Sequence, residues 1–403
     1  MKRRCLLIAA IILTALVLRA YAAATLPIDY DEPVYYTAAR FYANLIQNDR
    51  LAEIPRIAFN YEHPVLAKLV YGAVLSFFPS DGHYWGDVWQ FFSNNTPITA
   101  AVHPEKVFAL RMVSVLFGAL ETGVLTLISP LAGLILAVDS MSIKYTSVIY
   151  LEALPASLCM LAVFLFGKAH AWLRQKEKLS LRNHTRELLC LAGSAVCLGA
   201  AAAAKYQYGI VALAVGATYL ITVIPARRAD WTRWGLLIGL AALAAAAFVG
   251  ADPYLYPDPA GRLANSLAFS LDYQNGEAVR AAGYPFHQPL IWLSRPVTAF
   301  ATPIENQPMP ERGPEFIFLL DTFIFLLAIL GLPRLFKQQP VFFAWLAIGL
   351  AFLLIWNTKW PQYAVLVVAP MCLSASEGLS ALAEAGKKTW TKMMKRMRRN
   401  AEC

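Results

Sequence analysis

Charged residues are scarce in this chain of 403 residues. They make up 15% of it, whereas hydrophobic residues make up 58% and the mean hydropathy is +0.49. Soluble globular proteins carry about 25% charged and about 45–50% apolar residues. The composition therefore excludes a disordered chain, a collagen-like repeat and an ordinary soluble enzyme.

Other features are missing as well. The sequence has no HExxH spacing, no internal repeat and no low-complexity tract, and we expect no appended soluble domain. None of the six cysteines lies in a long polar segment, so neither a disulfide framework nor a cysteine-based zinc site is expected. The cysteines are Cys5, Cys159, Cys190, Cys197, Cys372 and Cys403.

What the sequence does contain is a series of apolar runs of roughly 15–23 residues, a length suited to crossing a bilayer. We predict an all-α polytopic membrane protein, with a single transmembrane domain over 1–403 and about ten membrane-spanning helices. The first span would run from the N-terminus through Arg19, whose side chain we expect to reach the outer interface. A cleaved signal peptide ending near Ala22 to Ala24 is the alternative. The other spans are predicted at 106–128, 130–146, 149–167, 188–205, 208–224, 235–251, 316–332, 341–357 and 363–381.

The net charge of +9 comes mainly from short segments between the apolar runs. By the positive-inside rule these segments would lie in the cytoplasm, so the charge indicates topology and no nucleic-acid partner. We predict a plasma membrane protein with both termini cytoplasmic and with long extracytoplasmic segments at 26–105 and 252–315. The basic clusters are 2–4, 168–187, 226–233, 333–340 and the tail 383–403.

Two apolar segments depart from this pattern. The run from Val65 to Phe78 is only about 14 residues long and contains Lys68, so we predict an interfacial or re-entrant helix there. The span at 130–146 is interrupted by Asp139.

The first extracytoplasmic segment begins with Asp31 and Glu32 followed by Pro33, a pattern typical of a helix start. Neighbouring helical side chains point about 100° apart, so the two carboxylates should face different partners. They can also simply cap the helix. The helix itself is predicted to be amphipathic and to lie along the membrane surface. Its apolar face would comprise Val34, Ala38, Phe41 and Leu45.

A second group follows at Glu62, His63 and Lys68. Glu62 and His63 can join Asp31 or Glu32 around a divalent cation, but a hydrogen-bonded interfacial histidine is the simpler interpretation. Lys68 suits a lipid phosphate, or it extends along the interface as lysines near membranes do.

More ionisable residues recur at the predicted outer ends of spans, where they are costly and favour a functional site. Together they predict a mixed acidic and basic pocket on the outer face. Such a pocket suits a sugar carried on a polyprenyl phosphate, because cations stabilise the departing phosphate and a carboxylate activates an acceptor hydroxyl. The residues are Arg111, Lys144, Glu152, Lys205 and Lys359, bordered by Asp252 and Asp258.

Several short motifs follow one another along the chain at Asp31, Glu32 and Tyr35; His63, Pro64, Leu66 and Lys68; Arg111 and Ser114; Glu152; Lys205 and Tyr206; and Lys359, Trp360 and Tyr363. This ordered set resembles glycosyltransferase family 39, polyprenyl-phosphate-sugar-dependent enzymes of the GT-C fold that include protein O-mannosyltransferases and aminoarabinose transferases. The sequence departs from the family pattern at Val65, which replaces a second proline, and at Ser147, which replaces an arginine for which Lys144 can substitute.

The resemblance implies a GT-C fold, a polyprenyl-phosphate sugar donor and an acceptor hydroxyl on a lipid, protein or glycan. It implies Asp31 as catalytic base in an inverting displacement, and no cofactor is certain. The expected site comprises catalytic Asp31, Glu32 and Glu152; donor-phosphate ligands Lys68, Arg111, Lys205 and Lys359; and pocket residues Tyr35, Glu62, His63 and Asp252.

Two other functions stay open. A transporter or flippase of a lipid-linked or anionic substrate would usually place its polar site near the bilayer midplane and show inverted repeats. A non-catalytic accessory subunit would bind lipid in the same pocket.

Overall fold

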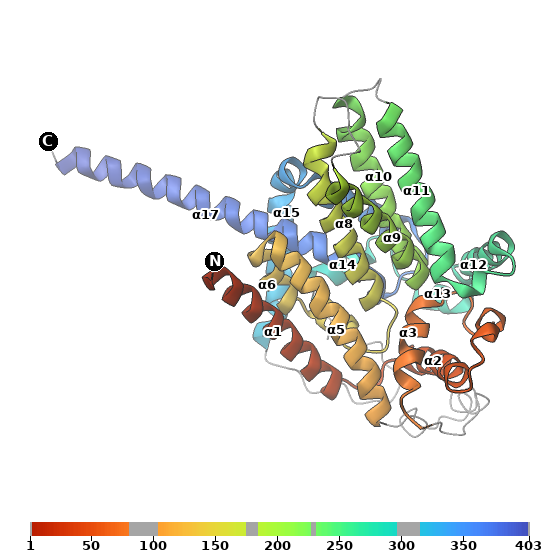
Figure 1. Ribbon diagram of the computed structural model, residues 1–403. Coiled ribbons are helices and arrows are strands. Elements are labelled where there is room, and N and C mark those ends of the chain that lie inside the picture. Colours follow the sequence, from red (N-terminus) through yellow and green to blue (C-terminus); the bar gives the residue numbers. More distant parts are fainter. Residues whose placement is uncertain (1, 80–103, 175–183, 227–230, 296–314, 402–403) are drawn as a thin grey trace.

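The structure, a computed structural model, consists of helices throughout its described residues (Figure 1). This agrees with the all-α membrane protein that the apolar runs predict. The described residues are 2–79, 104–174, 184–226, 231–295 and 315–401. Parts of both predicted extracytoplasmic segments, 80–103 and 296–314, and of the basic clusters, 175–183 and 227–230, lie outside them.

Among the described helices, six are long and apolar enough to cross a membrane. They are α1 (Lys2–Thr25), α5 (Pro104–Ile128), α8 (Ala153–Leu173), α9 (Thr185–Ala204), α11 (Trp231–Ala251) and α17 (Val365–Ala401). Shorter or only partly described apolar helices are α10 (Ile210–Thr222), α15 (Glu315–Gln338) and α16 (Pro340–Ile355). The short helix η3 (Tyr206–Gly209) precedes α10, and η4 (Ile224–Ala226) follows it. Every predicted span contains one of these helices, except for 130–146, and the total of ten spans stays a prediction.

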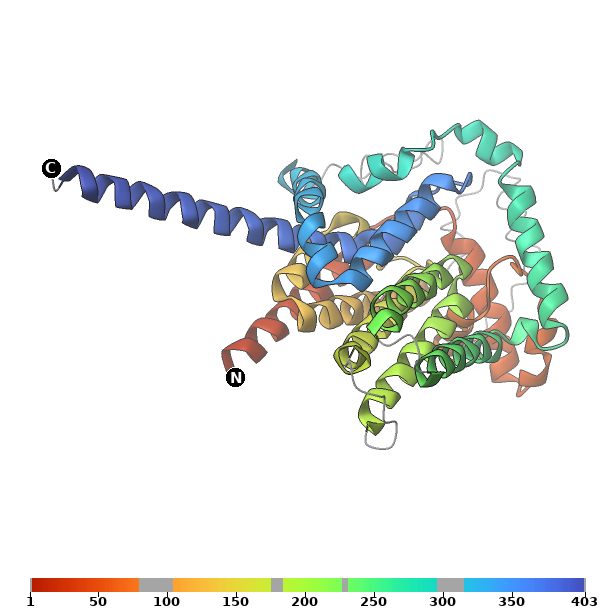
Figure 2. The same ribbon diagram turned by 90° about the horizontal axis from the view of Figure 1, so that it is seen from above.

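Glycines allow neighbouring helices to approach closely, as is common in membranes. Helix α1 packs beside α5, α9 packs beside both α8 and α11, and α15 packs beside α17 (Figures 1 and 2). A Cβ atom on Gly199 of α9 would meet the carbonyl oxygen of Ala244 in α11. One on Gly331 of α15 would meet the carbonyl oxygen of Ser374 in α17.

The predicted span at 130–146 is broken into α6 (Pro130–Val138) and α7 (Ser140–Tyr145). Asp139 causes the break: its backbone is extended and its side chain accepts a hydrogen bond from the Ser142 backbone nitrogen, which makes it the N-cap of α7. Helix α6 has nine residues, so alone it is about 13 Å long and too short to cross a bilayer.

The expectation that Arg19 reaches the outer interface is wrong. Its side chain is 0% exposed and lies against this break. The guanidinium donates to the carbonyl oxygens of Leu136 and Ala137 and to the hydroxyls of Ser142 and Thr146, at 2.7–3.5 Å. A broken helix leaves carbonyls without backbone partners, and an arginine with five donors can satisfy them inside the membrane domain.

The first of the two segments predicted to be extracytoplasmic, 26–105, folds in its described part into α2 (Glu32–Gln47), η1 (Leu51–Arg56) and α3 (Leu66–Leu75). Helix α3 matches the predicted short helix. Helix α2 was also predicted, and of its expected apolar face Ala38 and Leu45 are buried, while Val34 and Phe41 are partly buried. The buried face is broader because α2 packs tightly on α3, where a Cβ atom on Gly72 would meet the Tyr42 side chain.

The second predicted extracytoplasmic segment, 252–315, continues from α11 through η5 (Pro253–Leu255), α12 (Pro259–Tyr273), α13 (Glu277–Ala282) and α14 (Gln288–Ser294). Figure 2 shows these helices along one edge of the bundle, leading from α11 towards α15. Helix α14 packs against α15 and against η7 (Pro361–Ala364), the turn that precedes α17. This packing helps to fix η7 near the start of α2.

Candidate active site

Asp31 lies at the N-cap position of α2 and remains partly exposed. Its carboxylate Oδ2 accepts a hydrogen bond from Gln362 Nε2 at 3.2 Å, across a sequence separation of 331 residues. Within the described part of the chain the carboxylate has no second hydrogen-bond partner. Gln362 belongs to η7, so the start of α2 and the turn before α17 meet at this carboxylate.

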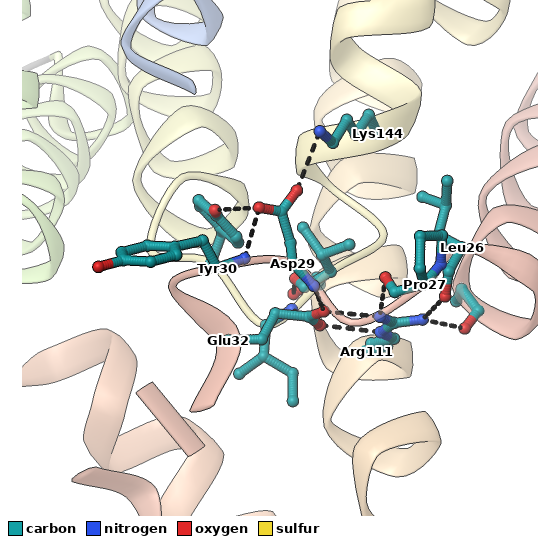
Figure 3. Close-up of polar contacts among 12 residues, drawn as sticks. Leu26, Pro27, Asp29, Tyr30, Glu32, Arg111 and Lys144 are labelled. Carbon is teal, nitrogen blue, oxygen red and sulfur yellow. Dashed lines mark hydrogen bonds and ion pairs between the residues drawn. The ribbon is translucent and has the colours of Figure 1, made fainter. Parts of the chain in front are cut away.

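Glu32 faces a different partner, as the angular offset between neighbouring helical residues predicts. Its carboxylate is 1% exposed and accepts two hydrogen bonds from Arg111, at 2.8 and 2.6 Å (Figure 3). The backbone nitrogens of Asp29 and Ile149 each donate another, at 2.8 Å. Glu32 therefore ties α2, α5 and the loop before α8 together.

Arg111 is saturated by the protein itself. Besides Glu32, it donates to the carbonyl oxygens of Ala23, Leu26 and Pro27 at 2.8–2.9 Å (Figure 3). These contacts engage all five N–H groups of the guanidinium. The geometry thus favours a structural role for Arg111 over the predicted contact with a donor phosphate.

Asp29 is a site residue to which the sequence analysis gave no role. Lys144 Nζ lies 2.9 Å from its Oδ2, and the Tyr150 hydroxyl donates to Oδ1 at 2.8 Å (Figure 3). Burial raises the pKa of Asp29, but Lys144 and Tyr150 outweigh this effect, so the net pKa shift is downward. The clue in the sequence was its position two residues before Asp31.

Glu152 and Lys205 form a buried ion pair between the start of α8 and the end of α9. Lys205 Nζ also lies 4.9 Å from the ring centroid of Tyr363. An ammonium has three N–H donors, and in the described residues only Glu152 accepts from this one. Lys205 is therefore a cation with donors to spare, while Glu152 holds it in place.

Lys68 is fully buried and its ammonium contacts backbone. It donates to the carbonyl oxygens of Asn60 and His63, at 2.6 and 2.8 Å, and more weakly to the Asn60 side chain at 3.3 Å. Burial lowers the pKa of Lys68 to about 8. All three donors are used, so Lys68 closes the loop before α3.

Lys359 is used in the same way at the end of α16. It donates to the carbonyl oxygens of Leu353, Leu354 and Trp356 at 2.6–3.2 Å. These are carbonyls of the last helical turn, which a lysine commonly caps. Of the four cations predicted to bind phosphate, only Lys205 keeps free donors in the described structure.

The four predicted pocket residues separate into two pairs. Tyr35 is buried and its ring lies edge-on to His63, with centroids 6.0 Å apart. Burial, together with Lys205 and Lys68, lowers the pKa of His63 well below its usual value, which makes the imidazole neutral at physiological pH.

The other pair is engaged in local structure. Glu62 accepts a hydrogen bond from Asn60 Nδ2 at 2.6 Å. Asp252 is buried and accepts from the Val65 backbone nitrogen at 3.3 Å and the Tyr206 hydroxyl at 3.4 Å. Asp252 thus connects the end of α11 to the start of α3.

The electrostatic surroundings of Asp31 suit a base. Burial raises its pKa to about 7, Lys205 opposes that rise, and the nearby carboxylates Asp29 and Glu152 add to it. A carboxylate with a pKa near the working pH accepts a proton readily and still occurs in its ionised form.

Metal ligands are not grouped in the described residues. No three His, Cys, Asp or Glu side chains there converge in an arrangement that can hold a metal ion. The divalent cation left open by the sequence thus has no candidate ligand set in the described part of the chain.

Comparison with known proteins assigns the family. The sequence model of the dolichyl-phosphate-mannose-protein mannosyltransferases matches residues 11–256, more than half of the chain. The chain belongs to this family. No curated protein matches it by sequence.

The fold is shown by a similar solved structure with a TM-score above 0.5. ArnT from Cupriavidus metallidurans bound to undecaprenyl phosphate superposes with a TM-score of 0.53 at 15% identity, over 92% of this chain and 60% of that one. The Pmt1–Pmt2 complex of S. cerevisiae bound to its sugar donor gives a TM-score of 0.42 at 18% identity, over 63% of this chain and 33% of that one. The chain thus has the GT-C membrane fold of ArnT and spans about three fifths of its length.

Proposed function

We propose that this chain is a membrane glycosyltransferase that moves a sugar from a polyprenyl-phosphate donor to an acceptor hydroxyl at the extracytoplasmic face of the membrane. The supporting observation is a contrast among neighbouring carboxylates. Asp29, Glu32 and Glu152 each contact a cation. Asp31 instead has the neutral amide of Gln362 as its one hydrogen-bond partner in the described structure, and it is partly exposed.

The proposed step is a single displacement. The acceptor hydroxyl gives its proton to the Asp31 carboxylate, and the acceptor oxygen forms a bond to the anomeric carbon. The bond from that carbon to the phosphate oxygen breaks, and its electron pair leaves with the polyprenyl phosphate. One displacement inverts the anomeric centre, and general base catalysis contributes about 10²–10⁴ in rate.

Lys205 is the proposed ligand of the departing phosphate. Its spare N–H donors can bind phosphate oxygens, and a fixed cation beside the leaving group stabilises the charge that develops there. Glu152 and the Tyr363 ring position this ammonium. Arg111 and Glu32 hold the backbone on which Asp31 sits. Family membership and the undecaprenyl phosphate bound by ArnT support the donor class.

The test uses purified protein in lipid nanodiscs with radiolabelled polyprenyl-phosphate sugars. We expect slow release of sugar to water by the wild type, and none by Asp31→Asn, with donor binding retained. Asp49→Asn is the matched control, because Asp49 is exposed at the other end of α2 and its left-handed backbone tolerates asparagine.

The other outcomes are equally informative. Turnover by Asp31→Asn would remove Asp31 as base. Donor binding without Asp31-dependent chemistry would favour an accessory subunit. Absence of binding to every such donor, together with vesicle uptake of an anionic or lipid-linked substrate, would favour a transporter.

A further inference from the structure

Helix α17 continues far beyond the bundle. It has 37 residues and is thus about 55 Å long, whereas the hydrocarbon core of a bilayer is about 30 Å thick. Its side chains are largely buried up to Gly378 and largely exposed from Leu382 to Met393. Figures 1 and 2 both show this last part projecting away from the other helices.

The point at which α17 leaves the bundle is marked by two features. Arg334 of α15 donates to the Glu384 carboxylate at 2.5 and 3.2 Å, which joins the two helices there. Two residues later comes Gly386, beside which a Cβ atom would meet nothing within 4 Å. A glycine inside a helix lowers the cost of bending, and no neighbouring group holds this one.

The exposed part of α17 is amphipathic. Leu379, Leu382, Trp390 and Met393 fall on one side at a spacing of 100° per residue, and Trp390 and Met393 are 60% and 44% exposed. Lys388 and Lys392 lie on the opposite side, with Lys387 at its border. The sequence adds four more basic residues, Lys395, Arg396, Arg398 and Arg399.

We propose that residues 387–399 form a lipid-binding helix that lies on the anionic surface of the leaflet from which α17 emerges, after a bend near Gly386. An apolar stripe containing tryptophan beside a lysine- and arginine-rich face is the pattern of interfacial helices. The concentrated positive charge fits anionic phospholipid headgroups, which attract basic segments next to a transmembrane helix. The apolar stripe then enters the headgroup boundary instead of water.

Spin labels on the full-length protein test this position. Single cysteines replace Met393 on the apolar side and Lys388 on the basic side, in a background whose native cysteines are changed to serine or alanine. Each variant is placed in nanodiscs of phosphatidylcholine alone or with about a third phosphatidylglycerol, enough to give a negative surface. Collisions with oxygen, which partitions into lipid, are compared with collisions with a water-soluble nickel complex.

With anionic lipid we expect the label at 393 to collide mainly with oxygen and the label at 388 mainly with nickel. In neutral lipid, or at about 1 M salt where charges are screened within about 3 Å, the ratio of oxygen to nickel collisions at position 393 should fall several-fold. Changing Lys387, Lys388 and Lys392 together to Gln should have the same effect at 393, whereas the matched change to Arg should not.

Two outcomes would overturn the proposal. Equally high nickel access at position 393 in both lipids would mean that the helix projects into water. Lipid-independent dipolar coupling between labels at 393 would mean that the stripe pairs with a second copy of the chain. Because the readout does not involve sugar transfer, neither outcome depends on the proposed enzymatic function.

Discussion

Arg111 and Glu32 form a buried ion pair in which every N–H group of the guanidinium has an acceptor. The guanidinium approaches the carboxylate at 2.8 and 2.6 Å, and its remaining donors take carbonyl oxygens at the end of α1 and just after it. Because Glu32 is turned towards α5, the preceding residue Asp31 faces Gln362. The pair therefore sets the direction of the proposed base without touching it.

Arg111→Lys tests this structural role. Lysine keeps the charge but loses the two-pronged geometry and several donors, so we expect the free energy of unfolding to fall by about 2–4 kcal/mol. Thermal unfolding in nanodiscs measures the loss. Arg50→Lys is the control, because Arg50 makes a similar two-pronged contact with Glu53 at the surface, where the cost is about 0–1 kcal/mol. An unchanged Tm with weakened donor binding would instead assign Arg111 to the phosphate.

Lys205 is expected to govern donor binding. Removing it alone leaves Glu152 charged and buried, so the informative variant is Lys205→Met combined with Glu152→Gln. We expect the Kd for the polyprenyl-phosphate sugar to rise at least about tenfold, since a charged hydrogen bond contributes about 1.5–3 kcal/mol. Glu152→Gln alone is the first control. Lys359→Met is the second control, because the Lys359 ammonium donates its hydrogen bonds to backbone carbonyl oxygens. This variant should mainly lower the Tm and should have a smaller effect on the Kd for the donor.

If Lys359→Met weakened donor binding as much as the double variant did, the proposed role of Lys205 as the principal ligand of the donor phosphate would be wrong. Equilibrium binding and Tm are measured on the same preparations, so that a folding defect is recognised.

The pH dependence of transfer follows from the pKa of Asp31, which burial raises to about 7. A base works in its ionised form, so kcat/KM should be low below pH 7 and rise to a plateau above it. Asp29 is one of the carboxylates that raise this pKa, so Asp29→Asn should move the rising limb to lower pH. Asp49→Asn should leave it in place. A limb that falls with increasing pH, or one that Asp29→Asn moves upward, would contradict the assignment.

Membrane orientation is open to a direct test. With both termini cytoplasmic, a cysteine at Asn48 should react with an impermeant maleimide on intact cells, and one at Arg174 only after permeabilisation. Both side chains are exposed, and the two residues follow the last turns of α2 and α8. The opposite labelling pattern would place the Asp31 site in the cytoplasm and exclude the extracytoplasmic reaction.

The sequence predicted the helices well because a bilayer demands long apolar runs with satisfied backbones. It also predicted that Asp31 and Glu32 diverge. It was wrong about Arg19, whose hydrogen-bond partners lie far away in the sequence. No sequence pattern shows that the Arg19 guanidinium donates hydrogen bonds to the backbone carbonyl oxygens of Leu136 and Ala137, so the sequence alone places this side chain at the interface. The sequence likewise does not reveal that Lys359, a predicted phosphate ligand, donates to backbone carbonyl oxygens.

The contact between α15 and α17 yields a final prediction about stability. Gly331 and Gly378 lie where the two backbones cross, and a Cβ atom on Gly331 would meet the Ser374 carbonyl oxygen at a distance that real atoms do not reach. Gly331→Ala should therefore push the helices apart and cost about 1–3 kcal/mol, as overpacking does. Gly235→Ala in α11 is the matched control, since its Cβ would meet nothing within 4 Å and alanine favours a helix. A Tm lowered only by Gly331→Ala supports the crossing, whereas equal Tm values for both variants would show that α15 and α17 do not approach this closely in the membrane.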